Sequence, residues 1–265
     1  MYLDYWGFQE PPFENVPSSK LFFPSPQHEE ALMRLLYAVE RRKGVAMLTG
    51  EVGSGKTTVS KVFMNHIRNE RYEVVLITNP ALTPVDFIRG VLVKLGENGD
   101  DESKTVLLNR LENRITKNVE QGIETVLVVD EAHVIENKTT FEELRMLLNM
   151  QSEDRYLITL IIMGQPPLLD KISALQPLRE RIGIKYHLQP LDFRNTLRYL
   201  SFRLKGAGCR RGIFTKEAVL ALYDYSGGIP LRINSLCDRS LLLGMMRKAK
   251  VVDSKIINNA IEDLI

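Results

Sequence analysis

The sequence has 265 residues, of which 44% are hydrophobic and 26% charged, and its formal net charge is +2. These values are ordinary for a globular protein and allow one large domain, or a large and a small one, with a proper core. They exclude a uniformly basic protein that coats nucleic acid, although a local basic patch remains open.

Targeting and redox signals favour a cytoplasmic protein. The two cysteines, Cys209 and Cys237, are too few for a disulfide framework and are typical of small core residues in a reducing compartment. The N-terminal "MYLDYWGFQE" lacks the basic and apolar runs of a signal peptide. The longest apolar stretch, "YLITLIIMG", is far shorter than the ~20 residues of a spanning helix. We therefore expect a soluble, cytoplasmic chain with no membrane segment.

The first half of the chain alternates between helix and strand patterns. About 25 N-terminal residues are rich in aromatics and prolines, so we expect an ordered arm without a regular helix. The polar stretch "GENGDDESK" predicts a surface loop. Apolar spacing and capping residues predict helices over 26–44, from Lys56, from Thr83-Pro84 and over 105–120, with strands over 45–50, 72–79 and 125–130.

The second half adds two strands and then becomes helical. A helix is predicted over about 140–150, and strands over 156–164 and 184–189. No clear strand follows, and helices are predicted over about 192–206, 215–226, 230–248 and 254–264. The fold class is therefore α/β: a mostly parallel sheet with helices on both faces over 1–191, and a small all-helical lid over 192–265.

A phosphate-binding loop connects the first strand to its helix. Gly50, Gly55, Lys56 and Thr57 fill the pattern G-x-x-x-x-G-K-[ST]. The glycines let backbone N–H groups point at phosphate oxygens, and the helix N-terminus adds its positive end. Lys56 should reach the β- and γ-phosphates. The residues expected to contact nucleotide are Gly50, Glu51, Val52, Gly53, Ser54, Gly55, Lys56, Thr57 and Thr58.

An acidic pair ends the buried strand "VLVVD". We expect Asp130, together with Thr57, to hold Mg²⁺, and Glu131 to polarise the water that attacks the γ-phosphate. Only one strand-like segment separates the phosphate loop from this pair, an order that looks like the hydrolytic branch with an extra central strand. No guanine-reading N-K-x-D occurs, so ATP is favoured over GTP.

The letters "DEAH" also spell a helicase motif. Helicases of that type need two such α/β domains, whereas this chain has one followed by a helical tail. We therefore interpret His133 as a packed or hydrogen-bonding residue.

Polar and basic residues at later strand ends complete the predicted active site. Gln165 ends the strand "IIMG", where it can touch the γ-phosphate or the attacking water. Arg179 and Arg181 precede the last strand, and in a ring one of them can reach a neighbour's γ-phosphate as an arginine finger. We favour Arg181, with Arg179 as the alternative. The turn "GGIP" aims Arg232 back at the nucleotide.

These motifs, in this order, resemble an AAA+ ATPase. Longer stretches are similar to the ATPase domain of the general secretion pathway protein A family (ExeA-like), and the resemblance covers essentially the whole chain. The stretches that carry this resemblance are "DYWGFQEPPF", "SPQHEEALMRLLYAVERRKG", "GQPPL", "RIGIKYHLQPL" and "SGGIPLRINSLCDRSLL".

The resemblance implies that the arm lies near adenine and that the protein forms a nucleotide-dependent homo-oligomer. This sequence departs from the pattern in three ways. Gln165 replaces the usual asparagine. Leu231 occupies the position where many AAA+ proteins place the second-sensor arginine, and Arg232 comes next. Finally, the membrane segment and peptidoglycan-binding domain of well-known secretion members have no counterpart within these residues.

Three functions remain open at this point. The first is ATP-driven assembly of a secretion or pilus machine at the envelope. The second is DNA-linked work of the transposition-regulator type, and the third is a nucleotide-gated scaffold with little turnover. The basic residues that would meet DNA phosphates are Arg203, Lys205, Arg210, Arg211, Arg247, Lys248 and Lys250.

Overall fold

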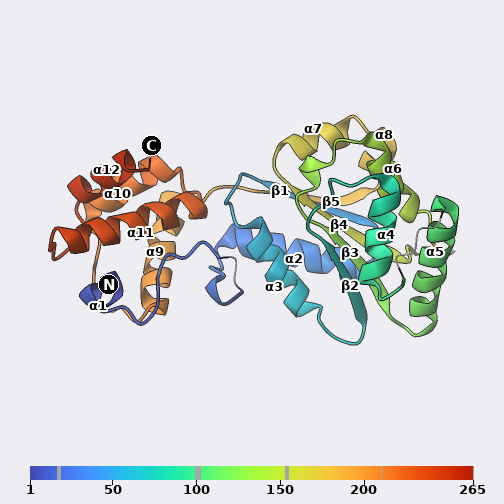
Figure 1. Ribbon diagram of the computed structural model, residues 1–265, viewed down its shortest axis with the longest axis horizontal. Coiled ribbons are helices and arrows are strands. Elements are labelled where there is room, and N and C mark those ends of the chain that lie inside the picture. The colour runs from blue at the N-terminus through green and yellow to red at the C-terminus, as the bar shows by residue number, and fades with distance from the viewer. Residues whose placement is uncertain (17–18, 99–102, 153–154, 210, 265) are drawn as a thin grey trace. The chain divides into compact units, whose positions relative to one another are not determined.

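A five-stranded parallel sheet organises the larger part of the molecule (Figure 1). The computed structural model describes residues 1–16, 19–98, 103–152, 155–209 and 211–264. The strand order is β2-β3-β4-β1-β5, so β4 lies between the strand of the phosphate loop and the strand of the acidic pair. This confirms the extra central strand. The strands are β1 (Val45–Gly50), β2 (Tyr72–Ile77), β3 (Glu124–Val129), β4 (Ile158–Gly164) and β5 (Ile182–Leu188).

Helices cover both faces of this sheet, as the alternating pattern predicts (Figure 1). Helices α2 and α3 lie on one face, and α4, α5 and α6 on the other. The bounds are α2 (Pro26–Glu40), α3 (Lys56–His66), α4 (Pro84–Lys94), α5 (Lys104–Glu120), α6 (Lys138–Leu147), α7 (Pro167–Ser173) and α8 (Gln176–Arg179), with 3₁₀ turns at Ser19–Leu21 and Ala132–Val134.

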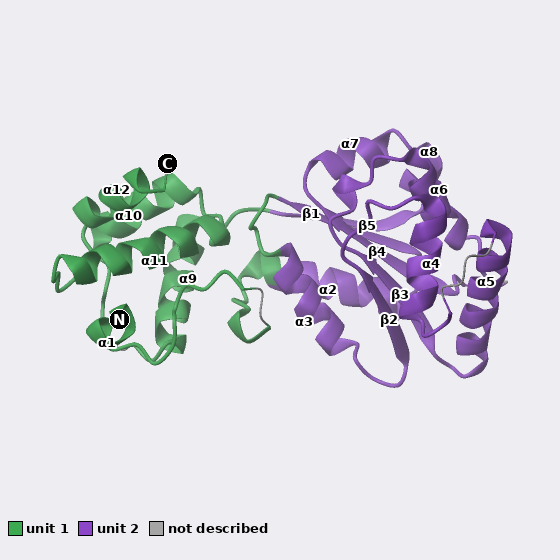
Figure 2. Cartoon of the chain, in the orientation of Figure 1, with its two compact units in different colours: residues 1–28, 51–55, 189–265 green, residues 29–50, 56–188 purple. Residues whose placement is uncertain are grey.

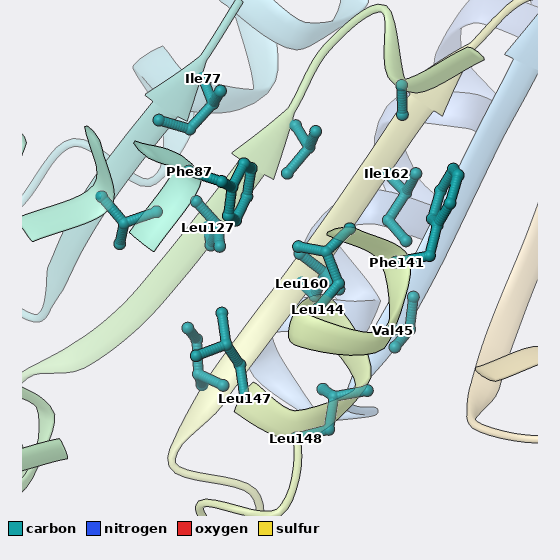
Figure 3. Close-up of a cluster of buried hydrophobic side chains, with 14 of the residues drawn as sticks. Val45, Ile77, Phe87, Leu127, Phe141, Leu144, Leu147, Leu148, Leu160 and Ile162 are labelled. Carbon is teal, nitrogen blue, oxygen red and sulfur yellow. The ribbon is translucent and has the colours of Figure 1, made fainter. Parts of the chain in front are cut away.

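The sheet core explains why its central strands are continuous apolar runs. Every residue of β1, β3 and β4 is buried, because helices close both faces. Figure 3 shows one of these faces, where Phe87 lies beside Leu127 and Leu144 lies beside Leu160. Fully burying each such side chain stabilises the fold by about 1.5–3 kcal/mol.

The chain divides into two compact units, shown in Figure 2. Unit 2 contains the sheet and comprises residues 29–50 and 56–188. Unit 1 comprises residues 1–28, 51–55 and 189–265. Its helices are α1 (Tyr2–Trp6), α9 (Phe193–Gly206), α10 (Lys216–Ser226), α11 (Pro230–Met246) and α12 (Ser254–Glu262). The four predicted tail helices are therefore present, and the expected domain boundary after residue 191 stays a prediction.

The N-terminal arm groups with the helical unit, whereas the sequence analysis placed it with the sheet. The reason is aromatic burial. Trp6, Phe8 and Phe13 belong to the same apolar cluster as the cores of α9, α10 and α11. The Trp6 indole donates a hydrogen bond to the Leu241 carbonyl at 2.9 Å, and it lies so close to Gly244 that a Cβ there would come within 2.7 Å of the ring.

Some local expectations were wrong or fall outside the described residues. Helix α1 forms inside the arm, because it ends at Gly7 before the first proline. The short helices α7 and α8 were not predicted. Residues 99–102 of the expected surface loop, and Arg210, lie outside the described residues. Within the described part of the chain, no helix has the length and apolar character to span a membrane.

One residue of the predicted basic set is buried. Arg203 is 5% exposed, and its guanidinium donates to the carbonyl oxygens of Pro12 and Glu14 at 2.6 and 2.8 Å. It also donates to the Tyr199 hydroxyl at 2.8 Å. Arg203 therefore secures the arm on α9, and its inclusion among DNA-contacting residues was wrong.

Candidate functional site

The phosphate loop follows β1 and leads into α3. Residues 51–55 group with unit 1, while Gly50 and the helix that starts at Lys56 belong to unit 2. Gly53 and Gly55 have φ angles of +77° and +105°, which favour glycine. The Ser54 amide donates to the Glu51 carbonyl at 3.1 Å, which closes the turn.

Lys56 and Thr57 open α3 at the carboxyl end of β1. Lys56 is 5% exposed, and its ammonium group donates to the Gly50 carbonyl at 2.9 Å, so the side chain folds back over the loop. The Thr57 hydroxyl donates to Asp130 Oδ2 at 3.3 Å. This contact brings together the two residues that the sequence assigned to a metal ion.

The carboxylate of Asp130 is buried, and its hydrogen bonds and Lys56 offset only part of the cost of burying its charge. It is 5% exposed, and its Oδ1 accepts from the Glu131 amide at 2.9 Å. Burial raises the pKa of Asp130, and the neighbouring charge of Glu131 raises it further, while the hydrogen bonds and Lys56 act in the opposite direction. A divalent cation beside this carboxylate would favour its charged form. The chemistry of Thr57 and Asp130 therefore fits Mg²⁺, which prefers oxygen ligands.

Glu131 adopts a backbone conformation that is unusual for its residue type. Its φ is +53°, in the left-handed region, and such strain in a non-glycine residue is common at functional sites. Its carboxylate lies 3.4 Å from the Gln165 amide nitrogen and 3.3 Å from His133 Nδ1. The structure thus brings together Glu131 and Gln165, from the ends of two neighbouring strands.

His133 is a hydrogen-bonding residue, as the sequence analysis expected. Its Nδ1 accepts a hydrogen bond from the backbone amide of Gln165 at 3.3 Å. The 3₁₀ turn that carries it is held by Lys171, which donates to the carbonyls of His133 and Ile135 at 2.5 and 2.8 Å. These contacts fix the ends of β3 and β4 with respect to each other, and they could not be read from local sequence.

His28 is a site residue that sequence reasoning missed. Its Nε2–H donates to the Ser54 carbonyl at 2.9 Å, and its Nδ1 accepts from the Ser25 hydroxyl at 2.7 Å. This tautomer follows because a carbonyl can only accept. A Cβ on Gly55 would come within 2.7 Å of Nε2, so His28 supports the loop directly. A histidine in "PQHEE" carries no motif that signals this role.

Within unit 1, the start of α11 lies against the phosphate loop. The Leu231 amide donates to the Gly53 carbonyl at 3.2 Å, and a Cβ on Gly53 would come within 2.2 Å of Leu231 Cβ. Only glycine fits there. Arg232 is the next residue and is exposed. The turn before α11 also requires glycine, because a Cβ on Gly228 would lie 1.8 Å from the Leu191 carbonyl oxygen.

The two finger candidates have different surroundings. Arg181 donates to the Arg145 carbonyl and to Asn149 Oδ1 at 3.1 and 2.8 Å, so its guanidinium is engaged at the end of α6. Arg179 is exposed at the end of α8, and no described residue forms a hydrogen bond or ion pair with its side chain. Of the two guanidinium groups, that of Arg179 is therefore the more accessible.

Comparisons with known sequences agree with this architecture. A profile of the AAA domain family matches residues 39–172. General secretion pathway protein A of Aeromonas hydrophila is 36% identical over 251 residues, which cover 93% of this chain and 45% of that protein. The chain therefore spans less than half the length of this relative.

Solved structures show the same fold at low identity. Drosophila ORC bound to DNA has a TM-score of 0.72 and 19% identity, covering 97% of this chain and 64% of that one. The Thermotoga maritima RuvB Holliday junction branch migration motor has a TM-score of 0.60 and 20% identity, covering 89% and 69%. Together with the strand order and the phosphate loop, the profile match shows that the chain belongs to the AAA domain family and is a homologue of general secretion pathway protein A.

Proposed function

We propose that this protein binds Mg·ATP and hydrolyses it in an oligomer. The observation that carries the proposal is the contact between Thr57 and Asp130, with Glu131 and Gln165 beside it. Phosphate-binding and acid–base groups converge there from the ends of three strands. A structural phosphate loop would not need a strained glutamate next to a poorly compensated carboxylate.

Each residue has a defined role in this proposal. The loop amides and Lys56 bind the phosphates, while Thr57 and Asp130 hold Mg²⁺, which supplies charge neutralisation on the phosphate oxygens. Glu131 accepts a proton from the attacking water, and Gln165 orients that water or Glu131 itself. Arg232, next to the residue that touches Gly53, binds the phosphates as well.

Turnover requires a second subunit in this proposal. The charge that develops on the γ-phosphate needs a cation, and Lys56 is already committed to binding. Arg179, whose guanidinium has no partner among the described residues, enters the neighbouring subunit's site, and Arg181 is the alternative. Nucleotide-dependent homo-oligomerisation follows, because each site is completed by its neighbour.

The proposed cellular role is assembly of a secretion or pilus-type envelope machine, driven from the cytoplasm. The support is the identity to general secretion pathway protein A, which includes nearly the whole chain. In the cell that encodes this protein, replacing the gene by a Lys56→Ala allele should block secretion or pilus assembly. Normal assembly in that strain would contradict the role while leaving the ATPase proposal intact.

Two substitutions test the biochemical proposal. Lys56→Ala should lose most Mg·ATP binding in calorimetric titration with a slowly hydrolysed analogue. Glu131→Gln should still bind ATP but release phosphate at least ~10²-fold more slowly, the scale of a positioned base. The matched control is Glu136→Gln, an exposed residue a few positions further on. Unchanged binding by Lys56→Ala overturns nucleotide binding at this loop, whereas normal turnover by Glu131→Gln reassigns only the base.

A further inference from the structure

A groove of about 890 Å³ lies entirely within unit 1 and contains none of the residues assigned to ATP. Helix α9 forms one wall, and the turn before α10 forms the other. Residues from the arm and from α10 complete the lining, which consists of Gln9, Leu197, Leu200, Ser201, Leu204, Lys205, Gly208, Cys209, Arg211, Gly212, Ile213, Phe214 and Val219.

The floor of this groove is apolar. Leu200, Leu204 and Ile213 form it and are nearly inaccessible, at 4%, 9% and 1% exposure. Leu197 stands at the edge and is 42% exposed, which is high for a leucine that faces a concave surface. A ligand that covers these side chains would remove further apolar area from water, at about 25 cal/mol per Å².

The rim of the groove carries positively charged side chains. Lys205 and Arg211 line the groove, and none of its described lining residues carries a carboxylate. Arg194 and Arg198 extend the positive edge along α9, because positions three and four apart share one side of a helix. No described residue forms an ion pair with any of these four side chains. The Arg211 guanidinium lies 5.7 Å from the Trp6 ring centroid, which holds it beside the groove.

We propose that this groove docks a short acidic segment of a partner protein. The segment carries apolar side chains that enter the groove, flanked by aspartate or glutamate residues that meet Arg198, Lys205 and Arg211. Apolar anchors would supply most of the affinity, and charge complementarity would supply specificity and a fast on-rate. Through this groove, the AAA protein would hold the component on which its ATPase cycle acts.

A protein segment fits these observations better than nucleic acid. Phosphate backbones are bound by cations and N–H donors along a track, and a leucine-lined floor between the cations adds nothing to that contact. An apolar floor with a charged rim is instead the usual composition of a peptide-binding groove. Duplex DNA is therefore the competing outcome of the test.

The experiment selects a random peptide library on the full chain and sequences the binders. We expect enriched peptides to combine leucine, isoleucine or phenylalanine with several acidic residues. Their affinity should fall severalfold as NaCl rises from about 50 to about 300 mM, because the rim charges become screened. Hydrogen exchange should show protection of α9 and of the turn before α10 when the best peptide binds.

Two variants and a control locate the binding. The double substitution Arg198→Glu and Lys205→Glu should weaken the best peptide by about tenfold or more. Leu197→Asp, which changes the floor edge alone, should do the same, and Lys255→Glu on α12 should not. All of these residues are exposed, so phosphate release should stay at the wild-type rate. The inference is overturned if no peptides enrich, if they carry no acidic bias, if the variants bind normally, or if the same variants lose duplex DNA instead.

Discussion

In unit 2 the buried carboxylate of Asp130 has two hydrogen bonds, and burial still raises its pKa. In unit 1 the buried guanidinium of Arg203 donates to three oxygens, two of them backbone carbonyls of the arm. Both side chains are 5% exposed, so burial alone does not distinguish them. The difference lies in how completely the folded chain satisfies the charge.

This difference separates a group prepared for a ligand from a group that holds the fold together. A buried charge with all its partners inside the chain stabilises one arrangement and has little left to offer a ligand. A buried or exposed charge that lacks partners can act on something that binds later. The same distinction applies to Arg181, which is engaged by α6, and to Arg179, which is not.

The finger arginines test this distinction with the largest expected effect. Arg179→Ala should lower the ATP hydrolysis rate by ~10³-fold with little change in ATP affinity, since fingers act on the transition state. Arg181→Ala should have a smaller effect on the rate. Steady-state phosphate release and calorimetry measure the two quantities separately.

Mixing inactive proteins decides whether the arginine acts across subunits. Lys56→Ala and Arg179→Ala should recover activity together, because some interfaces then combine an intact phosphate loop with an intact finger. Recovery should rise with total protein concentration. If instead Arg181→Ala is the inactive variant that complements Lys56→Ala, the finger is an arginine that already has hydrogen-bond partners. The distinction between engaged and unengaged charges would then fail.

Arg203 tests the other side of the comparison through stability. Arg203→Leu should lower the free energy of unfolding by about 3 kcal/mol, because the carbonyls of Pro12 and Glu14 lose the guanidinium that donates to them inside the protein. Arg194→Leu, on the exposed side of the same helix, should change it by no more than about 0.5 kcal/mol. Chemical denaturation followed by fluorescence of Trp6, the single tryptophan, measures both. Equal effects would mean that Arg203 does not hold the arm.

His28 sharpens the comparison with the smallest expected effect, because burial favours the neutral form of its ring. Burial lowers the pKa of His28, and the hydrogen bond to the Ser54 carbonyl opposes this only in part. The unfolded chain therefore binds a proton more readily than the folded one, and stability should fall as pH drops below about 6.5. This loss is greatest below the lowered folded-state pKa.

The substitution His28→Gln should flatten that part of the pH dependence. Glutamine can still donate to the Ser54 carbonyl, so ATP affinity should change only severalfold, while His28→Ala should weaken it further. His66→Gln, at the exposed end of α3, is the control and should leave the pH profile unchanged. Denaturation midpoints between about pH 7.5 and about pH 5.5 give the comparison. Parallel profiles for wild type and His28→Gln would show that His28 does not titrate on unfolding.

Periodic apolar patterns predicted the long elements, and proline or turn signals obscured the short ones. The strands around Leu127 and Ile161 are continuous apolar runs, and the tail helices repeat their apolar residues at helical spacing. Helix α8 has only four residues and includes Pro177, so no periodicity can reveal it. The convergence of Thr57, Asp130 and Glu131 was predictable too, because parallel strands place their carboxyl ends at one edge of the sheet.

By itself, the sequence determined the AAA fold class, the phosphate loop and the acidic pair, since these depend on residue types at fixed local spacing. Only the tertiary structure decided which charges are satisfied. Arg203 donates to the Pro12 carbonyl, 191 positions away in the sequence, and His28 donates to the Ser54 carbonyl, 26 positions away. Such partners depend on how distant segments pack, so the residues next to Arg203 and His28 in the sequence do not reveal them.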